Sequence, residues 1–149
     1  MEKLVFDNGL KEYDVNGTGI LRFNPSDPNV YGRFLDAVYE IKKVEQELLA
    51  KGKTLSGSDG EGVVRLMVES DKKVKSILRN VFGTSNDFDA IFNGVNIMAV
   101  ASNGERVITN FMVAIEPIVS SGAEKCAQQR VTDAVTAANL NRAQRRVNA

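Results

Sequence analysis

One amphipathic stripe constrains the fold of this chain more than any other feature. Apolar side chains recur at intervals of three and four residues, as Val30, Phe34, Ala37, Val38, Ile41, Val44 and Leu48. This spacing places them on one face of an α-helix. Asp27 suits the N-cap, Pro28 the first helical position, and Gly52 the left-handed position after the last turn. The sequence therefore predicts a helix over residues 28–51 with one buried face.

Two further helices are expected after a glycine-rich loop over residues 53–62. Residues 62–82 place Val64, Met67, Val74, Leu78 and Val81 on one face, which Asp71 interrupts. A short helix over residues 86–92 presents Phe88, Ile91 and Phe92. We expect the 28–51 helix to pack on the 62–82 helix and on the N-terminal sheet.

The N-terminal residues 3–23 are typical of a three-stranded antiparallel meander. Asn8-Gly9 is a strong hairpin signal, because a type I′ turn needs positive φ at both central residues. Centred there, Leu4 falls opposite Tyr13 and Phe6 opposite Lys11. A second turn over residues 16–19 leads into the third strand.

Residues 95–121 allow two interpretations. Asn103-Gly104 suits a hairpin between Ile97–Ala101 and Val107–Ala114, and it equally suits the start of a helix carrying Ile108, Phe111, Ile115 and Ile118. We favour a helix over residues 105–121, because Pro117 fits a helix kink better than a central strand.

The C-terminal residues 122–149 are rich in alanine and then basic. Ala127, Val131, Ala134 and Ala138 form a stripe too thin to bury much surface, and Arg142, Arg145 and Arg146 follow. The expected fold class is thus α+β. A single domain over residues 1–121 combines the meander with a helical bundle, and residues 122–149 form an extended helical or flexible basic tail.

Composition removes several classes of function. The chain has no histidine, only one cysteine (Cys126), and 19 acidic against 19 basic residues. A histidine base, a zinc site and a disulfide framework are therefore not expected, nor is bulk attraction to nucleic acid. No segment is apolar enough for a signal peptide or a membrane span. We expect a cytoplasmic protein without catalytic, cofactor-binding or metal-binding residues.

Three motifs resemble chemical sites and are better explained structurally. The segment beginning at Asp14 opens like a calcium loop, but Pro25 stands where the bidentate glutamate belongs, so a plain turn is expected. Ser70 and Lys73 have a catalytic spacing without companion motifs, which favours a solvated helix face. The glycines at 57, 60 and 62 lack the lysine of a phosphate-binding loop and predict a linker.

The three tail arginines have three interpretations. They are too few, and too far from any aromatic residue, for a convincing nucleic-acid arm. They can pair with carboxylates of a protein partner. A merely solubilising terminus is the simplest alternative.

The order of these elements resembles the short tail assembly chaperones of long-tailed phages and of prophages in Gram-positive bacteria. The matching segments are the N-terminal meander, the helix entry at residues 26–31, residues 81–83, 87–94 and 111–118, and the polar stretch from Asn141 to Arg146. The likeness covers most of the chain and is one of order and composition.

The resemblance implies a non-enzymatic chaperone. Such proteins bind and solubilise the tape measure protein, are thought to be displaced by tail tube subunits, and do not stay in the virion. We therefore expect the tape measure protein as partner, with the tail tube protein and self-association as further possibilities, and neither nucleic acid nor membrane. The expected partner-binding residues are Val131, Val135, Arg142, Arg145 and Arg146. The alternative is a structural phage protein, such as a head–tail connector or minor tail component.

Overall fold

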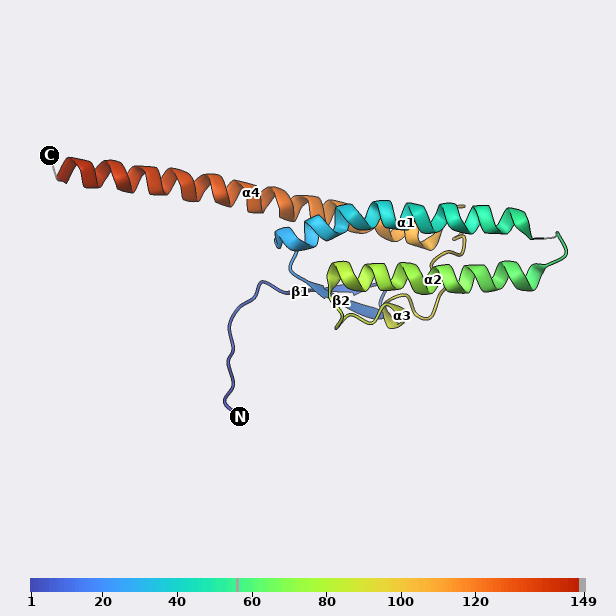
Figure 1. Cartoon of the computed structure of the whole chain (residues 1–149). Helices are drawn as coiled ribbons and strands as arrows, with labels where there is room; N and C mark the ends of the chain where they lie inside the picture. Colours follow the sequence, from blue (N-terminus) through green and yellow to red (C-terminus); the bar gives the residue numbers. More distant parts are fainter. Residues whose placement is uncertain (56, 148–149) are drawn as a thin grey trace.

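The computed structural model describes residues 1–55 and 57–147, and for residues 130, 131 and 147 it describes the backbone only. Within these described residues, two strands and four helices follow one another (Figure 1). They are β1 (Lys11–Val15), β2 (Gly19–Phe23), α1 (Pro28–Thr54), α2 (Gly60–Phe82), α3 (Phe88–Ile91) and α4 (Val107–Val147). The α+β class predicted from the sequence is confirmed.

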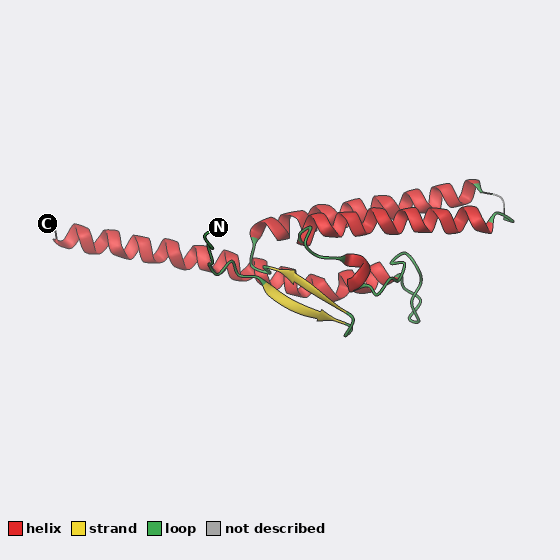
Figure 2. Ribbon diagram, turned by 90° about the horizontal axis from the view of Figure 1, so that it is seen from below, coloured by secondary structure: helices red, strands yellow, loops and turns green. Residues whose placement is uncertain are grey.

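The elements form two layers (Figure 2). The long helices α1 and α2 form an antiparallel pair, and the β-hairpin, α3 and the first part of α4 lie beneath it. The core fills the space between the layers. Its fully buried side chains include Leu21, Phe23, Val74, Leu78, Val81, Phe88, Ile97, Met98, Ile108 and Val119. We call the folded part from β1 to residue 122 the body.

Helix α1 matches its predicted start and buried face. The Asp27 side chain accepts a hydrogen bond from the Asn29 N–H at 2.9 Å, as an N-cap does. Six of the seven predicted stripe residues are buried, while Val38 is only partly buried. The helix continues past the predicted end at residue 51, and its C-cap is Leu55, whose N–H donates to Gly52 O. The prediction that Gly52 ends the helix was wrong.

The main partners of α1 are α2 and α4, so the predicted packing of α1 on the sheet is not one of its main contacts. Helix α2 begins two residues before the predicted position 62, since Asp59 accepts a hydrogen bond from Gly62 N–H and caps it. Its buried face includes Val74, Leu78 and Val81 as predicted. Val64, also predicted on this face, is 59% exposed, and the buried side chains of α2 begin only at Ser70.

The sheet has two strands, and the predicted first strand of the meander is not one of them. Gly9 has positive φ but Asn8 does not, so the type I′ turn expected at Asn8-Gly9 is not formed. Instead Gly9 N–H donates to Asp7 Oδ1 and the Asn24 side chain donates to Asn8 O. The second predicted turn is present: Asn16 and Gly17 both have positive φ, and Thr18 N–H donates to Val15 O.

The helical interpretation of residues 105–121 is confirmed, and a single β-bridge from Val100 to Arg106 remains of the alternative hairpin. Helix α4 runs through Pro117 and continues unbroken to Val147, 41 residues in all. The predicted tail is therefore helical in its described part. The short helix α3 lies inside the predicted range 86–92, with Asp87 as its N-cap.

The body ends where α4 passes the chain segment before α1. Gly122 is buried there, and a Cβ atom on it would lie 1.7 Å from the Pro25 carbonyl oxygen. Only glycine permits this approach between α4 and the entry to α1.

Candidate functional site

The second part of α4 leaves the body as a free helix (Figure 1). We call residues 123–147 the projecting half of α4. Its described side chains from residue 127 onward are all exposed. The start of this segment lies beside the first turn of α1, where Ala123 and Cys126 are half-buried. The part beyond residue 127 has too few apolar residues to form a core of its own, so further packing requires another molecule.

The predicted partner-binding residues all belong to the projecting half. Val135 is 55% exposed, and Arg142, Arg145 and Arg146 are exposed. The side chain of Val131 lies outside the described ones. At 100° per residue, positions 131, 135, 142, 145 and 146 fall within roughly 100° of one another around the helix axis. They therefore share one face, apolar first and basic toward the C-terminus.

A second candidate surface is an apolar groove between α1 and the body part of α4. It has a volume of about 390 Å³. The residues that line it are Phe34, Val38, Ile41, Lys42, Glu45, Ile108, Thr109, Met112, Val113 and Glu116. We call it the α1–α4 groove. Apolar side chains form most of its lining and charged ones flank it, a composition that suits the apolar face of an amphipathic helix.

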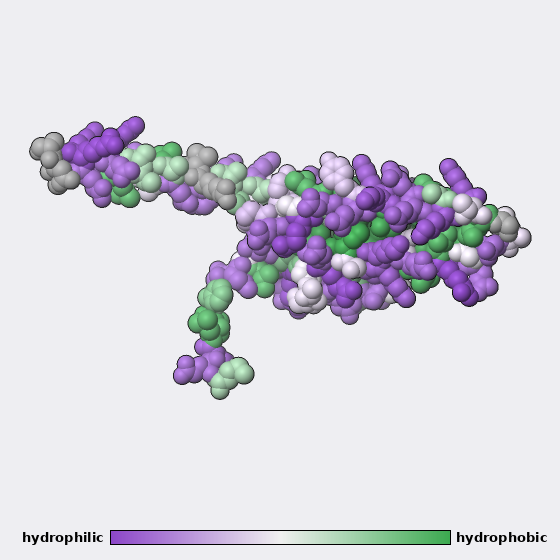
Figure 3. All heavy atoms as spheres, viewed as in Figure 1, coloured by the Kyte–Doolittle hydropathy of each residue, from purple (hydrophilic) through white to green (hydrophobic). Residues whose placement is uncertain are grey.

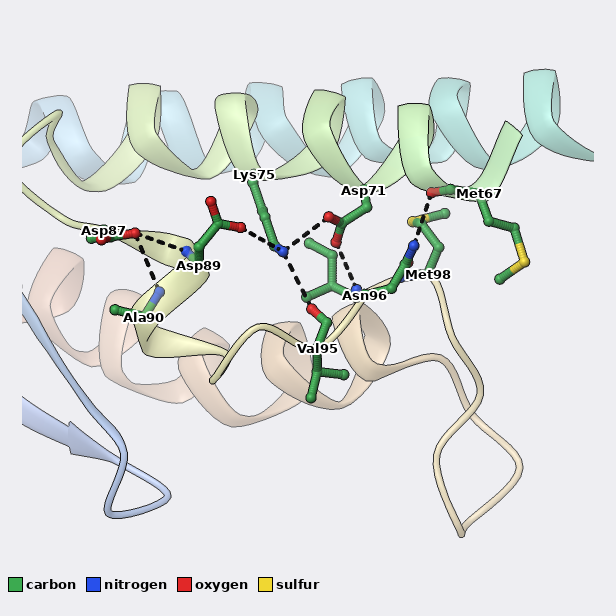
Figure 4. A network of polar contacts seen from close by, with 10 residues as sticks. Met67, Asp71, Lys75, Asp87, Asp89, Ala90, Val95, Asn96 and Met98 are labelled. Atoms are coloured by element: carbon green, nitrogen blue, oxygen red, sulfur yellow. Dashed lines mark hydrogen bonds and ion pairs between the residues drawn. The ribbon is translucent and has the colours of Figure 1, made fainter. Parts of the chain in front are cut away.

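A buried lysine, which the sequence analysis missed, links α2 to the segment after it (Figure 4). Lys75 is only 6% exposed. Its Nζ donates to Asp71 Oδ2 and Asp89 Oδ1, each at 2.9 Å, and to the Val95 carbonyl at 3.3 Å. Asp71 Oδ1 in turn accepts the Ile97 N–H at 2.8 Å. All three ammonium protons thus have acceptors, as a buried cation requires.

The electrostatics of this cluster favour a structural role. Burial alone would lower the pKa of Lys75, but the hydrogen bonds and charges of Asp89 and Asp71 outweigh it and raise the pKa. The hydrogen bond and charge of Lys75 lower the pKa of Asp89. A lysine that acts as nucleophile or base needs a depressed pKa, so Lys75 is held as an ammonium ion. The i, i+4 spacing of Asp71 and Lys75 on an apolar face was the available sequence signal.

The motifs dismissed from the sequence have structural roles. Asp14 Oδ1 accepts the Gly17 N–H at 2.8 Å, which makes it part of the hairpin turn. Ser70 is buried and donates to Leu66 O at 2.8 Å, so the expectation of a solvated face was wrong for this residue. Lys73, the second residue of that motif, does lie on the surface, and its Nζ is 3.9 Å from Glu47 Oε2 of α1. Within the described part of the chain, no three acidic or cysteine residues are grouped to hold a metal ion.

Comparisons with protein-family models, curated proteins and solved structures gave no match. In residues 1–55 and 57–147, no helix combines the length and apolar character needed to cross a membrane.

Proposed function

We propose that this chain is a non-enzymatic tail assembly chaperone that binds and solubilises the tape measure protein in the host bacterial cytoplasm. The resemblance described above supplies the identity of the partner. The physical support is a folded body that carries a long helix with nothing to pack on.

The observation that carries the proposal is the projecting half of α4. Most of the stability of helices in proteins comes from packing of an apolar face against other elements. Val135 and Leu140 are 55% and 60% exposed, so the free chain leaves that packing unmade. A long helical partner would provide it, and its carboxylates would pair with the basic end of the same face.

The α1–α4 groove supports the same proposal from the body. Its apolar lining is formed by rigid helices, so it needs little rearrangement to accept apolar side chains of a partner helix. A protein that keeps an aggregation-prone helical polypeptide in solution needs such apolar contacts and no reacting group. The charged, ammonium state of Lys75 is consistent with a function that uses no nucleophile or base.

Co-expression with the tape measure protein tests the proposal. Full-length chain should keep the tape measure protein in the soluble fraction, and a chain truncated after Leu140 should do so less well. Replacing Arg142, Arg145 and Arg146 by Gln should reproduce the electrostatic part of the loss, which should also shrink at high salt because exposed charges are screened. A matched control replaces Lys51 and Lys53, exposed at the opposite end of the molecule, by Gln.

Two results would refute the proposal. One is equal solubilisation by the truncated and the full-length chain together with no loss after groove substitution Met112→Asp. The other is the presence of this chain in purified mature particles, which would favour the structural phage protein instead.

A further inference from the structure

Residues 1–10 form an exposed apolar segment without regular structure. Leu4, Val5 and Phe6 are 89%, 87% and 72% exposed. The segment leaves the body near the start of β1, with its apolar side chains surrounded by solvent (Figure 3). Three consecutive apolar residues rich in β propensity at such exposure are costly unless another surface covers them.

The outer edge of β2 is closed by a side chain. Asn86 accepts the Arg22 N–H at 2.8 Å and donates to the Arg22 carbonyl at 2.9 Å, so its amide replaces a neighbouring strand. Arg22 thus directs its backbone groups away from β1. In an antiparallel pair the residue opposite does the same, and Glu12 is opposite Arg22.

The outer edge of β1 is open. By the same alternation, Glu12 and Asp14 direct their backbone N–H and carbonyl groups to that edge, and no third strand pairs with it in the described residues. An unpaired edge of this kind accepts an added strand.

A hollow lies beside this strand on its core-facing side. It has a volume of about 320 Å³ and brings Lys11 and Tyr13 of β1 together with Pro117, Ile118 and Ser121 of α4. Tyr13 points to the core and stacks on Phe23, with ring centroids 5.2 Å apart. A strand added next to β1 would direct every second side chain toward this hollow.

The exposed segment fits that edge in one antiparallel register. With Leu4 opposite Tyr13, Phe6 falls opposite Lys11 and both apolar side chains face the hollow. Lys3 then falls opposite Asp14 on the outer face, where opposite charges stabilise the pair. Val5 falls opposite Glu12, also on the outer face.

The backbone around residue 8 directs the segment away from its own sheet. A two-residue hairpin at Asn8-Gly9 would require positive φ at Asn8 as well as at Gly9, but only Gly9 has positive φ. The Asn24 side chain holds the Asn8 carbonyl at 3.2 Å, and a Cβ atom on Gly9 would lie 2.5 Å from Asn24 Nδ2. Within one chain, residues 3–7 match the open edge of β1 in side-chain pattern but do not pair with it.

We propose that residues 3–7 of one copy pair with β1 of a second copy, and that two copies exchange these segments reciprocally. Each sheet then has three strands, and the partner's Leu4 and Phe6 fill each hollow. Exchange of an identical element is a low-cost route to a symmetric dimer. This inference is independent of the proposed function.

Sedimentation equilibrium of three variants tests the exchange. The full chain should dimerise reversibly, and a chain lacking residues 1–7 should be monomeric. Leu4→Thr should weaken association by about tenfold or more, because an apolar contact in the hollow is lost. Val5→Thr is the control: it also replaces an apolar side chain by threonine, but on the outer face, and should alter association by less than about threefold. Both residues are exposed in the single chain, so neither substitution threatens the fold.

Cross-linking distinguishes exchange from folding back within one chain. In a Cys126→Ser background, separately prepared Val5→Cys and Glu12→Cys chains should be joined by a short bis-maleimide when mixed. A monomer at all concentrations, a dimer that survives removal of residues 1–7, or cross-linking only within the Val5→Cys/Glu12→Cys double variant would each overturn the proposal.

Discussion

The two halves of α4 have the same secondary structure and opposite surroundings. Residues 107–122 bury Ile108, Ile115 and Val119 in the core, and Gly122 lies close to the Pro25 carbonyl. Residues 123–147 continue the same helix, and its described side chains from residue 127 onward are exposed. The difference shows that α4 is stabilised by the body over one half only, so a helical backbone is no sign that a segment is packed.

The body and the projecting half also differ in how far their charged side chains are buried. The body holds Lys75 between two carboxylates with its ammonium protons all accepted, whereas the tail arginines lie in solvent. A buried charge that loses its partners is strongly destabilising, while an exposed one contributes little. We therefore expect substitutions to affect stability in the body and binding in the projecting half.

The largest effect is expected where α1 packs on the first half of α4. Phe34 is buried and faces the groove that Ile108 also lines. Phe34→Ala should lower the free energy of unfolding by about 3–5 kcal/mol, because it removes a ring and leaves a cavity. The control Val135→Ala, in the projecting half, should change it by less than about 0.5 kcal/mol. If urea titrations gave the same loss of unfolding free energy for Phe34→Ala and Val135→Ala, the distinction between a packed body and a projecting half would be wrong.

Lys75→Met should lower the free energy of unfolding somewhat less, by about 2–4 kcal/mol. The Asp89 side chain is 78% exposed, so water can replace part of its contact with Lys75.

The pH dependence of stability follows from the pKa shifts of Asp89 and Lys75. Asp89, with its lowered pKa, stabilises the fold above its ordinary pKa and loses this contribution as pH falls through the lowered value.

Lys75 acts at the opposite end of the pH scale. With its raised pKa it stabilises the fold below its ordinary pKa and loses this contribution as pH rises through the raised value. Stability measured across the pH range should therefore fall less steeply at both ends in Lys75→Met. The exposed Lys73→Met variant serves as control and should keep both slopes; identical pH profiles for Lys75→Met and the parent would contradict the assigned network.

Two glycines test the boundary between the halves. Gly122→Ala should destabilise the protein by about 1–3 kcal/mol, because its Cβ atom would overlap the Pro25 carbonyl. Gly32→Ala in α1 has nothing within 4 Å and should stabilise by about 0.5–1 kcal/mol through helix propensity. Thermal unfolding measures both, and a neutral Gly122→Ala would mean that α4 does not close on the segment before α1.

The smallest effect is expected from removing the end of α4. Truncation after Leu140 deletes only side chains that are exposed or lie beyond the described ones, so the unfolding free energy should change by less than about 0.5 kcal/mol. Circular dichroism should show a helical signal reduced in proportion to the residues removed. Loss of cooperative unfolding would place this end of the helix in the core.

Periodicity predicted the parts of the fold that depend on one local pattern. The stripe of α1, its Asp27 cap and the helix after Arg106 follow from spacing and capping chemistry. The failures have nonlocal causes. Asn8-Gly9 forms no hairpin, and the distant Asn24 side chain donates to the Asn8 carbonyl instead. Val64 is exposed because the buried face of α2 begins only at Ser70.

The candidate site was predicted unevenly for the same reason. The exposed basic face of α4 could be inferred from a thin stripe followed by arginines. The α1–α4 groove and the Lys75 cluster depend on which helices meet, and a pattern within one helix does not contain that information.

Amide hydrogen exchange along α4 distinguishes its packed half from its projecting half. We expect amides between Ile108 and Gly122 to exchange only through global unfolding, and those beyond residue 127 to exchange through local opening of far lower free energy. Protection should fall across the short interval after Gly122. Uniform protection along the whole helix in the isolated protein would contradict the division into a packed and a projecting half.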